Sequence, residues 1–147
     1  MKVVIFAGGL GTRLSELTET VPKPLVPVGG IPILMHIIDI YARQGHREFI
    51  VCCGYKMDRF VSYFDQAGIQ NSRGVYCLKS VSGEDVYIRL CDTGEKTNTA
   101  TRLRKVKSCI GKEDFFLTYA DGLANVNVDE LVQRNKESKG IVVVTAV

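Results

Sequence analysis

Short apolar runs recur along this chain and alternate with amphipathic stretches. The first run, residues 2–7, is rich in β-branched residues and stops at Gly8-Gly9, which predicts a strand buried on both faces. The same reasoning predicts further strands at residues 48–53, 75–79, 86–91, 113–119 and 140–147. No polar or turn residue follows the last of these runs, so we expect the chain to end inside its core.

Two helices are predicted between the first strands. From Ile31 the apolar residues recur at helical spacing, with Pro32 in the first turn and Gly45 suited to the end. Residues 57–64 form the second helix, and Asp58 places a carboxylate near its start, where it complements the helix dipole. A strand–helix rhythm therefore repeats in the first half of the chain.

Capping residues predict two more helices in the second half. Asn98 and Thr99 are alternative caps of a helix that runs to about residue 107. Asn127, with Glu130 three residues later, has the spacing of a capping box for a helix that Gly140 closes.

Strands that alternate with helices favour parallel pairing and right-handed crossovers, so we predict an α/β fold with one doubly wound, mostly parallel sheet and helices on both faces. Residues 75–79 and 86–91 are predicted to pair across a turn rich in serine, glycine and acidic residues. The 147 residues show no internal repeat and are interpreted as one domain. Ligands of such sheets bind beyond the carboxyl ends of the strands, where residues 8–13 and 120–122 are both expected to lie.

A glycine-rich loop follows the first predicted strand. Gly8, Gly9 and Gly11 lack a Cβ, so backbone N–H groups there are accessible to an anion, and phosphate is the natural ligand. The loop is not a dinucleotide fingerprint, because Leu14 stands where the third glycine belongs. It also lacks the Gly-x-x-x-x-Gly-Lys-Ser/Thr pattern of the P-loop.

Two cations follow these glycines. The Arg13 guanidinium stays charged and can bind two phosphate oxygens at once. Lys23 lies between Pro22 and Pro24, which fix their own φ angles and favour extended neighbours, so its ammonium is held on a stiff segment. Together with the glycines, these cations predict a polyphosphate site. The alternative is a tight strand-to-helix turn followed by a solvated arginine and a rigid loop.

Asp121 follows a predicted buried strand and precedes Gly122, at the mouth of the same crevice. A carboxylate there suits a Mg²⁺ ion that bridges phosphate oxygens. The alternative is a turn aspartate. His36 and His46 have no Ser, Cys or carboxylate partner at a suggestive spacing and are interpreted as structural.

Composition excludes several classes of function. The formal net charge is +3 and the basic residues are scattered apart from a cluster at residues 102–107, so we expect no nucleic-acid partner. No apolar run reaches the roughly 20 residues of a membrane span, and the N-terminus does not resemble a secretory signal. We therefore expect a cytoplasmic protein without a membrane partner. The five cysteines include no Cys-x-x-Cys pair and are interpreted as reduced core residues.

Two stretches, FAGGLGTRL and PKPLVPVGGIPIL, resemble the signature of the sugar-1-phosphate nucleotidylyltransferases. Three later stretches look most like the glucose-1-phosphate cytidylyltransferase branch of that family: FIVCCGYK, DTGEKTNTATRLRKV and FLTYADGLANVNVDELV. The resemblance runs along essentially the whole chain. It implies a Rossmann-like nucleotidyltransferase fold and a reaction in which a sugar phosphate oxygen attacks the α-phosphorus of a nucleoside triphosphate and pyrophosphate leaves.

The resemblance also implies roles for individual residues. The nucleotide-binding residues it implies are Ala7, Gly8, Gly9, Gly11, Thr12, Arg13, Lys23, Thr99 and Arg102. By the same resemblance, Arg13 stabilises the leaving pyrophosphate, Lys23 contacts the reacting phosphates and Asp121 binds Mg²⁺. These three residues are the implied catalytic residues. The implied ligands are CTP, glucose 1-phosphate and Mg²⁺, and the implied assembly is a homo-oligomer.

The chain departs from the family at two points. In the segment near the nucleobase, Ala100 and Thr101 stand where the cytidylyltransferase branch has a glycine pair, and their Cβ atoms narrow the base or ribose pocket. Family members resemble chains of roughly 250 residues, so the part that supplies a second metal-binding aspartate and a sugar-phosphate lysine is expected to be absent. The alternative is therefore a non-catalytic nucleotide-binding module or an inactive fragment of such an enzyme. A nicotinamide-dependent oxidoreductase is disfavoured by Leu14.

Overall fold

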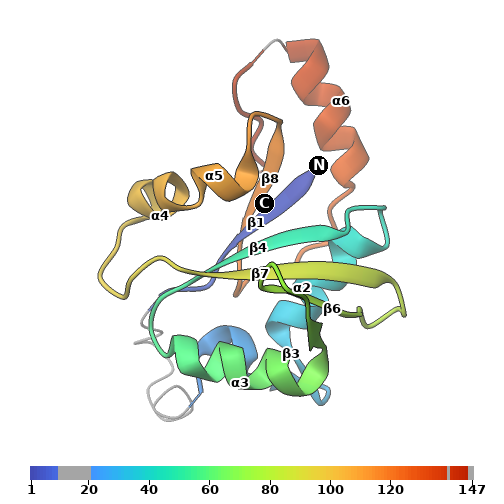
Figure 1. Ribbon diagram of the computed structural model, residues 1–147. Helices are drawn as coiled ribbons and strands as arrows, with labels where there is room; N and C mark the ends of the chain where they lie inside the picture. Colours follow the sequence, from blue (N-terminus) through green and yellow to red (C-terminus); the bar gives the residue numbers. More distant parts are fainter. Residues whose placement is uncertain (10–20, 139, 146–147) are drawn as a thin grey trace.

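A computed structural model describes residues 1–9, 21–138 and 140–145 of the chain (Figure 1). Its strands are β1 (Lys2–Phe6), β2 (Pro27–Val28), β3 (Ile31–Pro32), β4 (Glu48–Cys53), β5 (Ile69–Gln70), β6 (Val75–Lys79), β7 (Asp85–Asp92) and β8 (Phe115–Tyr119). Its helices are α2 (Ile33–Ala42), α3 (Met57–Ala67), α4 (Thr99–Lys105), α5 (Lys107–Ile110) and α6 (Val128–Ser138), with a short 3₁₀ helix, η2 (Lys23–Leu25).

Six strands form one twisted sheet in the order β5-β6-β7-β4-β1-β8. The four strands β7, β4, β1 and β8 are parallel to one another, whereas β6 pairs antiparallel with both β7 and β5. The predicted doubly wound, mostly parallel sheet is therefore confirmed, including the antiparallel pair that joins residues 75–79 to the following strand.

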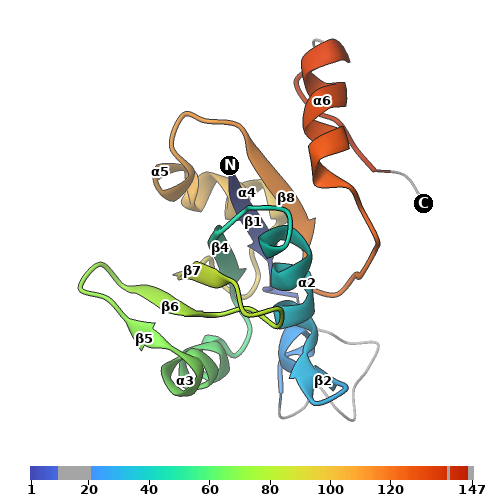
Figure 2. The same ribbon diagram turned by 90° about the vertical axis from the view of Figure 1, so that its right-hand side faces the viewer.

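Both faces of the sheet are covered, which explains why β1 and β4 have almost no polar positions. Helices α2 and α3 pack on one face, against residues such as Ile5, Val51 and Ile88, and α4 and α5 pack on the other, against Val4 and Ile50 (Figure 2). Alternate residues of one strand thus enter opposite cores. The central strands are buried on both faces, as the apolar runs predict.

Helix caps largely follow the sequence. Asn98, and not Thr99, caps α4: its side chain accepts a hydrogen bond from the Thr101 N–H at 2.9 Å. The Asn127 carboxamide oxygen accepts from the Glu130 N–H at 3.2 Å, so the predicted start of α6 is confirmed. The predicted helix from Ile31 begins two residues later, because Ile31 and Pro32 form β3 against β2.

The strand predicted at residues 140–147 is wrong over the described residues 140–145, which form no strand. Ile141 is fully exposed and Val142 is 71% exposed, so this part of the chain lies outside the core. After α6 the chain runs beside that helix and pairs with no described strand, while β8 forms an edge of the sheet (Figure 1). High β-propensity produces no strand without a neighbour to pair with.

Candidate functional site

The carboxyl ends of the parallel strands meet at one edge of the sheet. Phe6 at the end of β1 lies opposite Cys52 of β4 and Tyr119 of β8. Backbone hydrogen bonds continue the pairing beyond the strands, from the Ala7 N–H to the Cys52 carbonyl and from the Ala120 N–H to the Phe6 carbonyl, each at 3.0 Å. The glycine loop and Asp121 therefore leave the sheet side by side, as predicted.

The described part of the glycine loop ends at Gly9. Ala7 and Gly8 are buried, whereas Gly9 is exposed and a Cβ placed on it would meet nothing within 4 Å. Gly11, Thr12 and Arg13 lie outside the described residues, so their binding roles stay predictions.

Lys23 and Asp121 meet across the crevice although 98 residues separate them. The Lys23 ammonium donates a hydrogen bond to a carboxylate oxygen of Asp121 at 2.9 Å, and their side chains are 31% and 48% exposed. An ion pair this exposed is weak and can exchange its partners for a bound phosphate or metal ion. The structure thus brings together two of the three residues predicted to be catalytic.

The segment that carries Lys23 is anchored by its neighbours. Pro22, Pro24 and Leu25 are buried, and the Leu25 N–H donates to the Pro22 carbonyl at 2.8 Å. Lys23 itself opens the 3₁₀ helix η2, so the expectation of extended residues around the prolines is wrong at this position. A single tight turn replaces the extended form because its hydrogen bonds fold the segment back on itself.

Arg102 of α4 is buried, with 5% exposure, beneath the start of the glycine loop. Its Nη1 donates to the Cys53 carbonyl at 3.2 Å and to the Thr93 hydroxyl at 2.5 Å. Its Nη2 donates to the Gly8 carbonyl at 2.8 Å and to the Glu95 carbonyl at 3.1 Å. One guanidinium therefore ties together the chain just beyond β1, β4 and β7.

Thr99 is the first residue of α4 and is exposed, and it lies one helical turn before Arg102. Ala100 beside it is also exposed, and Thr101 is half-buried. The start of α4 is thus accessible to a ligand, whereas the Arg102 side chain points inward and is fully engaged with protein oxygens. The contacts that the resemblance implies for both residues stay predictions.

Three features of this network were missed in the sequence: the Thr93 hydroxyl, the Cys53 carbonyl and Gly54. A Cβ on Gly54 would lie 2.8 Å from the Gly94 carbonyl oxygen and 2.9 Å from Nη1 of Arg102, so only glycine fits there. Glycines directly after two apolar strands are the signal that could have found it, since each marks a close approach to another group.

The oxygen ligands available at the crevice decide whether the site suits Mg²⁺. Mg²⁺ that arrives with a triphosphate keeps several waters and needs one or two carboxylates. Asp121 is exposed at the crevice mouth and supplies one carboxylate, which fits this mode of binding. Among the described residues no cluster of three or more His, Cys, Asp or Glu side chains forms a closed metal site.

The cysteines fit the predicted core positions only in part, because Cys52 and Cys53 are buried whereas Cys77, Cys91 and Cys109 are half-buried. The five thiols are free, and burial raises the pKa of Cys52 to about 12, so this thiol stays protonated and unreactive. His36 Nε2 lies 3.0 Å from the Val28 carbonyl oxygen, and the His46 ring packs against Phe116 with centroids 4.7 Å apart.

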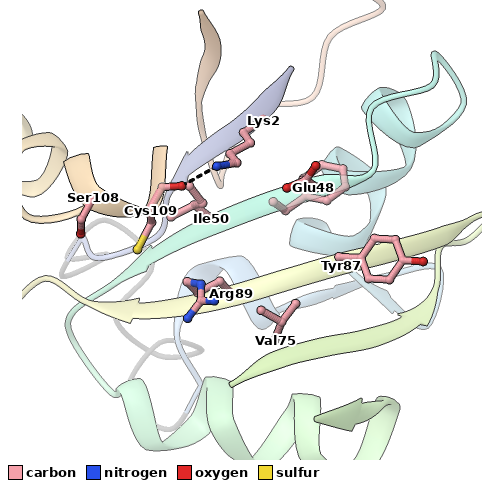
Figure 3. Close-up of a pocket in the computed structure, with 9 residues that line it drawn as sticks. Lys2, Glu48, Ile50, Val75, Tyr87, Arg89, Ser108 and Cys109 are labelled. Carbon is pink, nitrogen blue, oxygen red and sulfur yellow. Dashed lines mark hydrogen bonds between the residues drawn. The ribbon is translucent and has the colours of Figure 1, made fainter. Parts of the chain in front are cut away.

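A separate hollow of about 290 Å³ lies on the sheet face beside α5 (Figure 3). Lys2 and Glu48, at the amino ends of β1 and β4, line it together with Tyr87 and Arg89 of β7. The Lys2 ammonium donates to the Cys109 carbonyl at 2.7 Å and thereby neutralises the end of α5. This hollow is distinct from the crevice at the carboxyl ends of the strands.

None of the helices in the described ranges is long and apolar enough to cross a bilayer.

Comparisons with known proteins agree with this geometry. A sequence profile described as Nucleotidyl transferase matches residues 2–147. A probable glucose-1-phosphate cytidylyltransferase of Bacillus subtilis (strain 168) is 42% identical over 156 residues, which cover 100% of this chain and 60% of the relative. The glucose-1-phosphate cytidylyltransferase of Salmonella typhimurium is 39% identical over 144 residues, which cover 92% of this chain and 56% of the relative. The chain therefore spans little more than half the length of these relatives.

A solved structure is similar over nearly the same region. The crystal structure of HddC from Yersinia pseudotuberculosis complexed with GMP-PN superimposes with a TM-score of 0.68 at 22% identity, covering 91% of this chain and 53% of that chain. At this identity the likeness concerns the fold, and it confirms the predicted fold class.

Proposed function

The chain belongs to the nucleotidyl transferase family, and from this premise we propose that it acts in the transfer of a nucleotidyl group from a nucleoside triphosphate to a sugar 1-phosphate. The observation that carries the proposal is the meeting of Lys23 and Asp121 beside the glycine loop, at the carboxyl edge of the sheet. A cation and a carboxylate at this edge are what a triphosphate and its metal ion require.

The reaction is in-line displacement at the α-phosphorus, and charge neutralisation does most of the catalytic work. The Lys23 ammonium, released from Asp121, neutralises the reacting phosphates. Arg13 is proposed to bind the pyrophosphate as it leaves, because a guanidinium fork matches two phosphate oxygens. Backbone N–H groups of the glycine loop orient the triphosphate.

Mg²⁺ is the proposed cofactor, and Asp121 is the residue that would hold it. When bound, the ion supplies further neutralisation of the triphosphate charge. Lys23 and Asp121 pair with each other in the structure and are each proposed to gain a new partner on substrate binding, so neither charge is left unpaired before or after.

CTP and glucose 1-phosphate are the proposed substrates. The two relatives named above are glucose-1-phosphate cytidylyltransferases, and their similarity over this chain supports that choice. The start of α4, with exposed Thr99 and Ala100, is the proposed wall of the base pocket. A cytoplasmic location and a homo-oligomer remain part of the proposal.

The second candidate is a nucleotide-binding module without turnover. The residues brought together at the crevice are proposed to serve the nucleotide and its metal ion, and this is all that such a module requires. Both candidates share the nucleotide site, so binding and turnover must be measured separately.

The first experiment is calorimetric titration of the purified chain with CTP, UTP, GTP and dTTP, each with Mg²⁺ and without sugar phosphate. Selective binding of CTP supports the proposed nucleotide. Failure to bind any of the four refutes a working nucleotide site in this chain.

Turnover separates the enzyme from the module. If Arg13 and Asp121 serve the transition state, Arg13→Ala and Asp121→Ala lower the rate of CDP-glucose formation far more than they lower CTP affinity. Equal losses in both quantities favour the module. A wild-type chain that binds CTP but forms no product establishes it.

A further inference from the structure

The buried guanidinium of Arg102 has no carboxylate partner in the described part of the chain. The four oxygens that accept its hydrogen bonds are three backbone carbonyls and the Thr93 hydroxyl. None of the ion pairs formed by described residues includes Arg102, and the neighbouring Asp92 carboxylate accepts instead from the Gly94 N–H at 2.9 Å. A charged group held by neutral oxygens keeps a strong field in its buried surroundings.

This field acts on the first peptide of the glycine loop. The Gly8–Gly9 peptide is trans, so its C=O and N–H groups point in opposite directions. Its carbonyl accepts from Nη2 of Arg102 at 2.8 Å, which aims the Gly9 N–H away from the guanidinium. Gly9 is exposed, a Cβ there would meet no described residue within 4 Å, and its N–H donates to no described residue. Among the described residues, nothing therefore competes with a ligand for this N–H.

We propose that Arg102 is a positioning residue that fixes and polarises the Gly8–Gly9 peptide from inside the protein, so that the Gly9 N–H and the buried positive charge together favour phosphate at the loop. This inference rests on the proposed nucleotide site. It differs from a direct contact with the nucleobase, because a residue behind the loop acts on the phosphates alone.

A positioning role behind the loop and a direct contact with the nucleobase predict that loss of Arg102 weakens the binding of different ligands. At an effective dielectric constant of about 20, a unit charge roughly 8 Å from a phosphate changes a binding constant by about 30-fold. Loss of the Arg102 charge therefore weakens CTP and inorganic pyrophosphate by about tenfold or more, while cytidine, which has no phosphate, changes by less than about twofold. A nucleobase contact predicts the reverse, with cytidine weakened and pyrophosphate unchanged.

The test titrates the purified full chain with CTP, inorganic pyrophosphate and cytidine. The variants are Arg102→Gln, which removes the charge, and Arg102→Lys, which keeps it without the planar fork. Arg104→Gln is the matched control, since Arg104 lies on the same helix with an exposed side chain. Circular dichroism and thermal melting establish that each variant is folded.

The expected result is selective loss of CTP and pyrophosphate binding in Arg102→Gln, partial recovery in Arg102→Lys, and no change in Arg104→Gln. Equal loss of all three ligands, no loss, or loss of cytidine alone overturns the inference. If Arg102→Gln does not fold, Thr93→Val is used instead, since it removes one acceptor and loosens the guanidinium without removing its charge. A smaller loss of CTP and pyrophosphate binding, with cytidine unchanged, is then expected, and no such selective loss overturns the inference. If the wild-type chain binds neither CTP nor pyrophosphate, the proposed function itself has failed, and the inference with it.

Discussion

Gly8→Ala tests whether the guanidinium of Arg102 is the reason that only glycine fits at position 8. A Cβ on Gly8 would overlap Nη1 of Arg102 and would lie 2.5 Å from Cζ and 2.8 Å from Nη2. Because no real Cβ tolerates such contacts, the guanidinium must leave its site. Gly54 and the chain beyond β7 close the site from other sides, so small adjustments do not relieve the overlap.

The cost follows from the contacts that are lost. Displacement of Arg102 breaks four hydrogen bonds from a charged donor. It removes the donor to the buried Gly8 carbonyl, whereas the Cys53 carbonyl still accepts from the Thr93 N–H and hydroxyl. An unpaired buried polar group costs about 1–3 kcal/mol, and solvent or rearranged donors recover part of the total. We expect Gly8→Ala to lower the free energy of unfolding by about 3–5 kcal/mol. For a chain of this size, that corresponds to a fall in Tm of about 10 °C or more.

A double-mutant cycle in urea assigns this cost to one contact. In an Arg102→Ala background the guanidinium is already absent, so Gly8→Ala should cost less than about 1 kcal/mol there. Gly9→Ala is the matched control, since a Cβ at Gly9 meets none of the described residues within 4 Å, and it should leave the unfolding midpoint almost unchanged. Equal costs of Gly8→Ala in both backgrounds would refute the reasoning, because the Cβ would then meet something other than Arg102.

Three further predictions concern stability and reactivity. Asp39, buried on α2, accepts hydrogen bonds from the Ser82 N–H and from two serine hydroxyls. Asp39→Ala should therefore lower the free energy of unfolding, measured in urea, by about 3 kcal/mol. Arg43→Ala removes only an exposed ion-pair partner of Asp39 and should lower it by less than about 1 kcal/mol. Burial lowers the pKa of His46, so the unfolded chain binds the proton more readily and the free energy of unfolding should fall as the pH drops below about 6.5. In His46→Phe the plot of this free energy against pH should be flatter in that range. An unchanged slope would contradict the prediction. Burial raises the pKa of Cys52 to about 12, so its alkylation by iodoacetamide should be slow in the native protein and fast in urea, as mass spectrometry of the modified peptides would show.

The elements that the sequence predicted well are those whose signal is local. Residues 48–53 and 75–79 coincide with β4 and β6, because each is a mostly apolar run with β-branched or aromatic residues, bounded by residues that favour turns. Asn98 and Asn127 mark helix starts through hydrogen bonds to backbone N–H groups within three residues. In these cases the physical cause lies inside the segment itself.

The elements that the sequence predicted poorly depend on distant partners. Residues 140–145 have strong β-propensity, yet strand formation needs a neighbouring strand, and the described chain places none beside them. Ile31 and Pro32 continue a helical pattern but pair with β2, because the turn at Gly29 and Gly30 brings the two segments together. Both Gly29 and Gly30 have positive φ, which fixes that turn.

Gly8 shows why the candidate site was only partly predictable. Its missing Cβ was interpreted as room for an anion to approach the backbone, but the space is filled by Arg102, 94 residues away in sequence. A glycine in a sequence can indicate that another group approaches the backbone closely, but the sequence does not identify that group. Here the neighbour is a cation on the inner side of the loop, while Gly9 leaves the outer side open. Glycine is therefore required at position 8 by the Arg102 guanidinium, whereas at position 9 it leaves the backbone open to a ligand. The two positions contribute to one phosphate site if the peptide between them is polarised by Arg102, so that the Gly9 N–H becomes a stronger donor. Ligands without negative charge gain nothing from that arrangement, so the loop should discriminate by phosphate before any contact with base or sugar is made.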